Sequence, residues 1–500
     1  MALLCNLLLG FFICFASIGG FHLQAEQLQQ EAFTSIVVSE NGLDFLKDLF
    51  VSQGVSSILT LKLPSVEKSE TIPFLGKAQL TFSNITIAEA NISNSYVQPG
   101  DSGVNLVVSE INCNLSLNWF YEFYGSLVPV EISDHGTATV QIDGMEVGLT
   151  LGLHMEEGHL ILSLTDYGCY VKDILIKLDG GASWFYQGLI NALEDQIRVA
   201  VENAITKALT EGVAKLDNFL QSLPKDISVD ETASINVTFV SQPCLTNSSI
   251  EFQLSGLFFP KANVPLFFHP TANFQSLVAC KDSNKMLGIS LDEAVFRSAS
   301  ALYYDAKFMQ LIVDKIPDQP FLNTAGWRFI IPQLYKNYPN EDMQLNITLS
   351  SPPSINISAD GIETIIDSDL VVNILDPNQT ISVICISFVI QGSGSVNIMG
   401  NMIKGSIKLN DFSMALKWSA IGNLRMRLIQ PVMRTIIQTV VLPFANSHLG
   451  HGFPLPIIAG FTLQDAETVF TSSRISVCSD VSYEDKLQFG SYIRFSDKTL

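Results

Sequence analysis

The chain has 500 residues, 47% of them hydrophobic and 15% charged, which excludes a disordered protein and suits about two to four domains with large cores. The formal net charge is −21, so we expect no nucleic-acid partner, because such partners need a basic surface. The 32 Phe residues, against 4 Trp, favour an apolar lining in addition to an ordinary packed core.

The first 25 residues have the composition of a secretory signal peptide. They contain no charged side chain and include an apolar run from Leu7 to Ile18. This run is too short for an uncleaved membrane anchor, and the polar stretch Glu26–Gln30 follows the segment. We therefore predict that residues 1–25 are a signal peptide and that the protein is secreted to the extracellular space.

Asn-x-Ser/Thr sequons support secretion independently. In one alternating stretch, Asn236 points outward if Ile235 and Val237 point inward. We expect N-glycosylation at Asn84, Asn91, Asn114, Asn236, Asn247, Asn346, Asn356 and Asn378.

The first half begins with an amphipathic stretch and continues with strands. Apolar residues recur at near-helical spacing from Ile36 to Phe50, with Ser39 and Asn41 as start signals and Gly54 as a stop, which predicts a helix. Alternation of apolar and polar residues predicts strands at Ile58–Leu63, Ala78–Ala88, Val104–Phe123, Gly136–Leu153 and His159–Ile176.

The clearest helical pattern follows these strands. Ser183 can cap it, apolar residues recur every three to four positions from Phe185 to Leu220, and Pro224 ends it. About 38 residues would span about 57 Å, so the apolar stripe needs an equally long sheet to cover it. A coiled-coil dimer is the weaker interpretation, because the flanking strands supply a partner within the same chain.

The second half repeats this order less cleanly. A short helix is predicted at Leu291–Ala306, and a second apolar stretch, Leu424–Leu442, should be kinked, delayed or shortened by Pro431 and Pro443. Strands are predicted at Gln344–Ile357, Asp369–Leu375, Ile381–Ile390, Ser395–Ile407 and Phe412–Trp418. The repetition, at about residues 27–259 and 287–489, describes two containers better than a catalytic scaffold.

Several short motifs, taken in order, resemble the family of lipopolysaccharide-binding protein and bactericidal/permeability-increasing protein within the tubular lipid-binding superfamily, most closely its plant members. The order and spacing of the motifs carry the resemblance over nearly the whole mature chain. The motifs are Ser39–Asp44, Leu63-Pro64, Phe74–Lys77, Asp143–Met145, Ser350–Pro353 and Gly452–Pro456.

The resemblance implies an α+β fold: a boomerang of two tandem barrel-like domains, each a twisted antiparallel sheet wrapped on a long helix, joined by a central sheet. We place the signal peptide at 1–25, the N-terminal lipid-binding barrel at 26–227, the central sheet and linker at 228–265 and the C-terminal barrel at 266–500. The implied function is to hold acyl chains of phospholipid or lipopolysaccharide in apolar pockets, in innate immune sensing of lipopolysaccharide. A phospholipid carrier or transfer protein without lipopolysaccharide specificity is the alternative.

The cysteines depart from the family pattern. Six remain after the signal segment, and animal members join a Cys near Cys169 to one in the following helix, where this chain has none around Ile205 and Thr206. From this departure we hypothesise a disulfide between Cys169 and Cys113, on a nearby strand of the same sheet.

The charges depart from the family pattern as well. Animal members that neutralise endotoxin use a basic N-terminal tip. Up to Glu231, however, this chain has 10 Lys and Arg against 28 Asp and Glu, a net charge of −18. The remainder of the chain has 18 Lys and Arg against 21 Asp and Glu, a net charge of −3. Lys62, Lys68 and Lys77 are the candidates for a local basic contact; the other interpretation is scattered solvated lysines.

An aromatic run from Trp119 to Tyr124 offers a different contact. On an exposed hairpin its rings, Trp119, Phe120 and Phe123 among them, could insert into a membrane surface. The alternative is that alternate rings face the core, and the sequence leaves both open.

The sequence contains no nucleophile elbow, zinc-protease motif, P-loop or dinucleotide fingerprint. His154 and His159 flank a Glu-Glu-Gly turn, and His448 and His451 lie on a predicted loop, so structural roles are favoured for both pairs. We expect no enzyme, no catalytic residue, no metal and no cofactor; a secreted lipid hydrolase is the remaining alternative of another class. The oligomeric state is left open.

Overall fold

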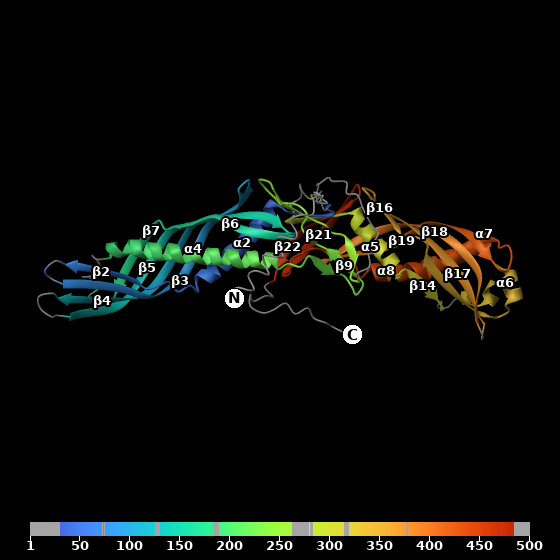
Figure 1. Cartoon of the computed structure of the whole chain (residues 1–500), viewed down its shortest axis with the longest axis horizontal. Coiled ribbons are helices and arrows are strands. Elements are labelled where there is room, and N and C mark those ends of the chain that lie inside the picture. Colours follow the sequence, from blue (N-terminus) through green and yellow to red (C-terminus); the bar gives the residue numbers. More distant parts are fainter. Residues whose placement is uncertain are drawn as a thin grey trace, which may run out of the picture. The chain divides into compact units, whose positions relative to one another are not determined.

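The computed structural model describes residues 31–72, 74, 76–125, 131–181, 183, 190–262, 280, 284–314, 320–376 and 379–484. The predicted signal peptide and the sequon at Asn378 lie outside these residues. Residues from Ala32 onward form one compact unit, in which antiparallel sheets and long helices alternate (Figure 1).

The N-terminal half consists of a curved antiparallel sheet packed on one long helix, α4 (Asn191–Gln221) (Figure 1). The strand order is β2-β3-β4-β5-β6, with β7 also paired to β5. The strands are β2 (Val66–Ile72), β3 (Gly76–Gly100), β4 (Gly103–Gly125), β5 (Glu131–Glu156), β6 (His159–Tyr170) and β7 (Asp173–Asp179).

The core of this half joins the inner face of the sheet to the apolar stripe of α4. Every second residue of β5 is buried around Val140 and Ile142, as strand periodicity requires, and Ile197, Val201 and Ile205 are buried on α4. The predicted long helix is confirmed over Asn191–Gln221, which is 31 residues; Phe185 lies outside the described residues.

Two predictions near the N-terminus are wrong. Ile36 lies in strand β1 (Thr34–Val38), because both edges of that strand are paired, and Ser39 then caps helix α2 (Glu40–Ile58). The helix continues past Gly54, where no neighbouring atom approaches, and takes up the start of the strand predicted at Ile58–Leu63.

A third correction concerns the strand predicted at His159–Ile176, which is divided into β6 and β7. Side chains of α4 take the backbone groups at the break: Arg198 donates to the carbonyl of Val171, and Glu202 accepts its N–H at 3.0 Å. These groups are therefore not available for strand pairing.

The C-terminal half repeats the plan with the strand order β14-β15-β17-β18-β19-β20 and β16 paired to β17. Its strands are β14 (Gln310–Val313), β15 (Asp342–Leu349), β16 (Ser354–Ser358), β17 (Gly361–Asp376), β18 (Gln379–Met399), β19 (Met402–Ser419) and β20 (Phe453–Pro454). Its helices are α5 (Glu293–Asp305), the 3₁₀ turns η3 (Pro320–Leu322) and η4 (Thr324–Trp327), α6 (Pro332–Asn337), α7 (Met426–Ile436), the π-helical η5 (Ile437–Val441) and α8 (Leu442–Leu449).

The hairpin between β18 and β19 turns at Gly400, later than the sequence pattern placed it. Gly392 and Gly394 lie inside β18, although the sequence pattern treats them as a break. A Cβ on either glycine would lie within 2.9 Å of side-chain atoms of neighbouring strands, so these residues serve close packing and not a turn.

A central six-stranded sheet connects elements from the whole chain, in the order β10-β11-β1-β13-β22-β21. Its strands beyond β1 are β10 (Cys244–Leu245), β11 (Ile250–Leu254), β13 (Leu287–Asp292), β21 (Phe461–Thr471) and β22 (Arg474–Tyr483). A small sheet adds β8 (Asp226–Ser228), β9 (Ala233–Asn236) and β12 (Phe258–Pro260). The central sheet thus draws strands from outside 228–265, while the domain boundaries stay a prediction.

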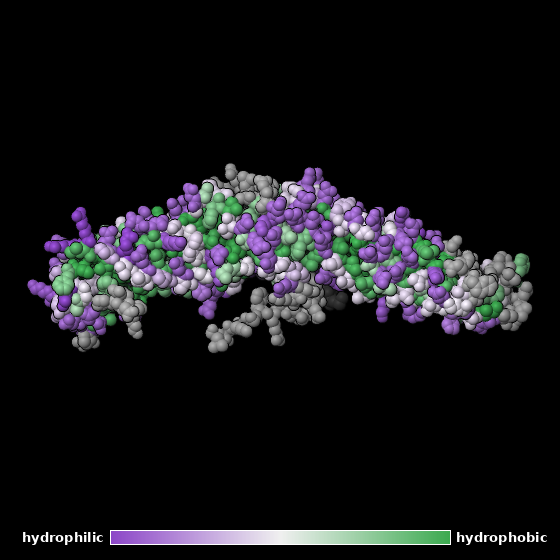
Figure 2. Space-filling view, turned by 180° about the vertical axis from the view of Figure 1, so that it is seen from behind, coloured by the Kyte–Doolittle hydropathy of each residue, from purple (hydrophilic) through white to green (hydrophobic). Residues whose placement is uncertain are grey.

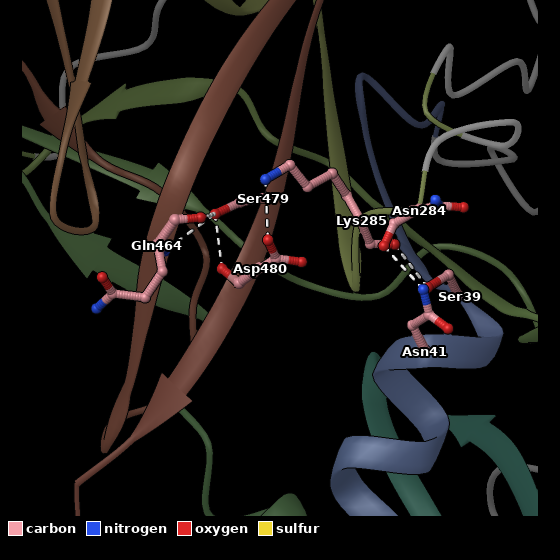
Figure 3. A network of polar contacts seen from close by, with 7 residues as sticks. All are labelled: Ser39, Asn41, Asn284, Lys285, Gln464, Ser479 and Asp480. Atoms are coloured by element: carbon pink, nitrogen blue, oxygen red, sulfur yellow. Dashed lines mark hydrogen bonds and ion pairs between the residues drawn. The ribbon is translucent and has the colours of Figure 1, made fainter.

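A polar network fixes the start of α2 to this sheet (Figure 3). Ser39 Oγ donates to the carbonyl of Lys285 at 2.7 Å, and Asn41 Nδ2 donates to the carbonyl of Asn284 at 2.8 Å. Lys285 Nζ in turn lies 2.9 Å from Asp480 Oδ2 in β22. The cap of α2 is therefore held by segments that lie more than two hundred residues later in the chain.

The predicted Cys113–Cys169 disulfide is wrong, and a bond between Cys280 and Cys478 is present instead, with a Cα–Cα distance of 5.7 Å. Cys113 lies in β4 and Cys169 in β6, and β5 runs between them. Two strand spacings are about 9–10 Å, which exceeds the Cα separation of about 7 Å that a disulfide can bridge.

Candidate functional site

A groove between the edge of β19 and the last helix is a candidate binding site, with a volume of about 380 Å³. Its lining combines apolar and polar side chains, so it matches a molecule with both kinds of surface. The lining residues are Ile407, Lys408, Leu409, Gln438, Leu442, Pro443 and Asn446.

Asn446 joins the two sides of the groove through hydrogen bonds. The N–H of Ile407 donates to Asn446 Oδ1 at 2.7 Å, and Asn446 Nδ2 donates to the carbonyl of Ile407 at 3.0 Å. Beyond Ile403, β19 has β18 as its strand partner on one side only, so these two bonds replace the missing strand at this point. The side chain links the helix to the sheet without filling the space between them.

The last helical run is irregular because of its sequence. Pro431 lies inside α7, the π-helical η5 comes next, and Pro443 begins α8, in which no residue is buried. Proline and π segments interrupt the regular hydrogen bonding of a helix and change the direction of its later turns. The prediction of an irregular second helix is confirmed, although the helical run Met426–Leu449 is neither late nor short.

A second, apolar cavity lies deeper in the same half. Its volume is about 10 Å³, room for no more than one water molecule, so the cavity is closed in this conformation. It is lined by Trp327, Ile331, Leu334, Met343, Leu345, Val372, Ile384, Ile386, Ile429 and Met433. Leu409 and Leu442 of the groove pack against the same apolar cluster, so groove and cavity share one core.

Among the residues that the structure describes, Met426–Leu449 is one helix long and apolar enough to cross a membrane, a test that core helices also pass. Ile429, Met433 and Ile436 on this helix are buried against the sheet. One face of the helix therefore packs against the sheet, while only 28% of its most apolar stretch is buried.

Comparison with known proteins identifies the family. The model of the LBP / BPI / CETP family matches its N-terminal domain to residues 42–223 and its C-terminal domain to residues 227–483. The chain belongs to the LBP / BPI / CETP family. The resemblance predicted from the sequence is thereby confirmed.

Relatives in this family match along most of their length. A protein of Arabidopsis thaliana assigned to the BPI/LBP family is 56% identical over 94% of this chain and 96% of its own. Human lipopolysaccharide-binding protein is 22% identical over 86% of this chain and 89% of its own. A crystal structure of lipopolysaccharide binding protein aligns with a TM-score of 0.64 at 18% identity, covering 91% of this chain and 99% of that chain. This likeness confirms the predicted α+β class of two sheet-and-helix halves joined by a central sheet.

In this family member the aromatic run in β4 alternates between core and solvent. Trp119 is 1% exposed and donates Nε1–H to the carbonyl of Asp179, and Phe123 is half-buried. Phe120 and Tyr124 face outward. Of the two interpretations, alternate rings facing the core is confirmed, and an exposed contact at Trp119 is wrong, because strand periodicity directs this ring into the core.

The three candidate lysines do not form one patch. Lys62 bridges to Thr86 in β3, about 30 Å along that strand from Lys77, and Lys68 is half-buried in β2. The prediction did not include Phe74, which lies near Lys77 at the turn between β2 and β3. Phe74 is 84% exposed and has a φ of 67°. An aromatic residue with positive φ in a hairpin turn carries a conformational cost, and no sequence pattern signals it.

The sequon asparagines differ in exposure. Asn84, Asn91, Asn247 and Asn356 are exposed, and Asn114, Asn236 and Asn346 are half-buried. At Asn236 the inward position of Ile235 is confirmed, but the amide oxygen of Asn236 accepts the N–H of Thr238 at 2.9 Å. Glycosylation itself stays a prediction.

The thiols of the buried Cys113 and the half-buried Cys169 carry no sign of a reactive site. Burial raises the pKa of Cys113 to about 11, with a contribution from Asp143, and burial raises the pKa of Cys169 to about 12, with contributions from Glu202 and Cys113. Both thiols therefore stay protonated and unreactive at neutral pH. Within the described residues no group of three His, Cys, Asp or Glu side chains is placed to hold a metal.

Proposed function

We propose that this protein is a secreted lipid-binding protein that holds acyl chains of phospholipid or lipopolysaccharide in its apolar interior. The groove of about 380 Å³ between β19 and the helical run Met426–Leu449 carries the proposal, because it opens the apolar core beside polar groups that could face a headgroup. Relatives named for binding lipopolysaccharide support the same class of ligand.

Lipopolysaccharide, and with it a role in innate immune sensing, is our first candidate ligand, since the relatives' names point to it. A phospholipid carrier or transfer protein is the second, because the net charge of −18 up to Glu231 opposes an anionic ligand at the N-terminal half. A lipid hydrolase is the less favoured interpretation, and we propose no catalytic residue.

Native mass spectrometry of the purified protein tests lipid binding directly. We expect co-purifying lipid that lipopolysaccharide displaces, and displacement that weakens little between low and physiological salt would indicate apolar capture. Displacement by phospholipid but not by lipopolysaccharide would select the carrier function. Protein that carries and takes up no lipid would refute the proposal.

A groove-filling variant locates the ligand. Leu442→Trp adds a large ring to the groove and should lower the bound lipid several-fold, because the acyl chain and the ring compete for the same space. Leu175→Trp is the matched control, since Leu175 is 63% exposed in β7 of the other half. Equal lipid content in the two variants would place the lipid elsewhere.

Secretion and glycosylation form part of the same proposal. Expression with the leader in a eukaryotic host should release protein that lacks residues 1–25, and enzymatic deglycosylation should lower its mass. We expect glycans first at the exposed Asn84, Asn91, Asn247 and Asn356. Retention of the leader in the secreted protein would contradict this part.

A further inference from the structure

Helix α2 is attached firmly at its two ends and weakly between them. At its start Gly42 and Leu43 are buried, and a Cβ on Gly42 would meet the carbonyl oxygen of Met286. Just after its end, the N–H of Leu63 donates to the carbonyl of Ile85 in β3 at 3.2 Å. The structure describes every residue of this helix, and after Leu43 none of them is buried.

The polar side chains of α2 do not attach it to the sheet. Among the described residues, those of residues 44–60 form hydrogen bonds and ion pairs only within this segment, such as the pairs of Lys47 with Asp44 and Asp48. Three serines donate their hydroxyls to carbonyls three or four residues earlier in the same helix: Ser52, Ser56 and Ser57. Bonds of this kind slightly destabilise a helix, so they do not compensate for the missing contacts.

Helix α5 shows how a firmly attached helix of this protein differs. Six of its 13 residues are buried. Four of its side chains bond to backbone groups of residues 350–357, in and before β16: Glu293, Arg297, Ser300 and Tyr304. In the described part of the chain, α2 makes no such bonds to β3 between its two ends. Its attachment there depends on half-buried apolar side chains alone.

The second half of α2, residues 51–58, also has a sequence that forms a helix weakly. Gly54 lies in its middle, where no neighbouring atom comes within 4 Å of the position that a Cβ would take. Inside a helix, Gly favours the unfolded state about fivefold more than Ala does. Segments with few buried contacts and weak local structure open before the rest of a protein, and lids are drawn from such segments.

This half of α2 covers an apolar part of the N-terminal sheet. The helix lies along β3, beginning where Leu43 shares an apolar cluster with Val97. Further along β3, Ala90 and Ile92 are half-buried and pack against the core under α4, as does Ile58 at the end of α2. Figure 2, in which this half of the protein lies on the right, shows hydrophobic residues at the surface among hydrophilic ones. Opening residues 51–58 would uncover apolar side chains that are only partly covered now.

We propose that residues 51–58 form a lid that unfolds locally and admits an acyl chain between α2 and β3. The inference rests on the proposed function, because it needs a lipid ligand, and it adds a second route into the apolar interior. Ile58 packs against the core while the lid is closed, so a chain binds there only when the lid is open. The apparent affinity is therefore reduced by the fraction of time that the lid is open, and this space holds less lipid than the groove.

Hydrogen exchange of the full chain measures the opening of the lid. The amides of residues 51–58 should exchange about tenfold or more faster than those of Val201 and Ile205 in α4. Gly54→Ala should slow exchange in the lid about fivefold, because Ala favours the helix and the site has room for its methyl group. The matched control is Gly212→Ala, at an exposed position of α4 that also has no atom within 4 Å, and it should leave the lid unchanged. Equal protection of α2 and α4 would overturn the proposal.

Native mass spectrometry connects the lid to lipid binding. In the Leu442→Trp background the groove is filled, so the remaining bound lipid reports the other route. At subsaturating phosphatidylcholine, Gly54→Ala should lower this remaining lipid about fivefold, whereas Gly212→Ala should not. No remaining lipid in this background, an unchanged level in Gly54→Ala, or an equal fall in Gly212→Ala would overturn the lid while lipid in the groove persists. Absence of lipid from the unaltered protein would refute the proposed function and the lid with it.

Discussion

The helices of the two halves cover their sheets in different ways. α4 is a single helix of 31 residues, and its buried stripe, from Leu193 to Val213, packs against its sheet. The helical run Met426–Leu449 is divided by Pro431 and a π segment, buries no residue in α8, and leaves a groove of about 380 Å³. Two copies of one architecture therefore need not provide two equal binding spaces, because the interrupted helix of the second copy borders a groove.

The largest effect expected from this comparison is on stability. Ile197→Ala should lower the free energy of unfolding by about 2–5 kcal/mol, because Ile197 is 1% exposed and its removal leaves a cavity under α4. Leu442→Ala in the groove should cost about 1 kcal/mol or less, because that side chain already borders open space. Urea unfolding followed by circular dichroism measures both, and equal costs would mean that the groove is as tightly packed as the α4 core.

The features of the two helices that depend on local sequence patterns were predictable from the sequence. The apolar stripe of α4 repeats every three to four residues, and Pro431 marks the second helix as irregular. The groove was not predictable, because it depends on how α8 packs beside β19, to which Asn446 joins it. The partner of Cys478 depends on tertiary structure, because Cys280 lies outside the strands, and strand order puts a whole strand between Cys113 and Cys169. In the sequence, Phe329 lies in an apolar run and resembles a core residue. Only the structure shows that it is exposed while Trp327 and Ile331 are buried.

A smaller effect should follow from Asn446→Leu. The substitution leaves the N–H and carbonyl of Ile407 without the two bonds that replace a strand partner, which costs about 1–3 kcal/mol. Asn218→Leu, at an exposed position of α4, is the control and should be nearly neutral. Hydrogen exchange should show faster exchange at Ile407 in the first variant alone. Unchanged protection there would indicate that the helix does not depend on Asn446 for its position beside β19.

The smallest effect concerns pH and the C-terminal sheet. Burial alone would raise the pKa of Asp369, but the hydrogen bonds from Lys417, at 2.7 Å, and from Ser387 outweigh it and hold the pKa below the ordinary value of 3.8. A lowered folded-state pKa contributes stability that is present above about pH 4 and is lost as the pH falls through the folded value. In Lys417→Met the stabilising hydrogen bond is absent, so the difference in urea midpoint from the unaltered protein should be greatest near neutral pH and should vanish in acid. Lys215→Met on α4 should show no such pH-dependent difference, since Lys215 has no ion-pair partner among the described residues. If the urea midpoints of Lys417→Met and the unaltered protein differed by the same amount at all pH values, Lys417 would stabilise the C-terminal sheet through packing and not through its ion pair with Asp369.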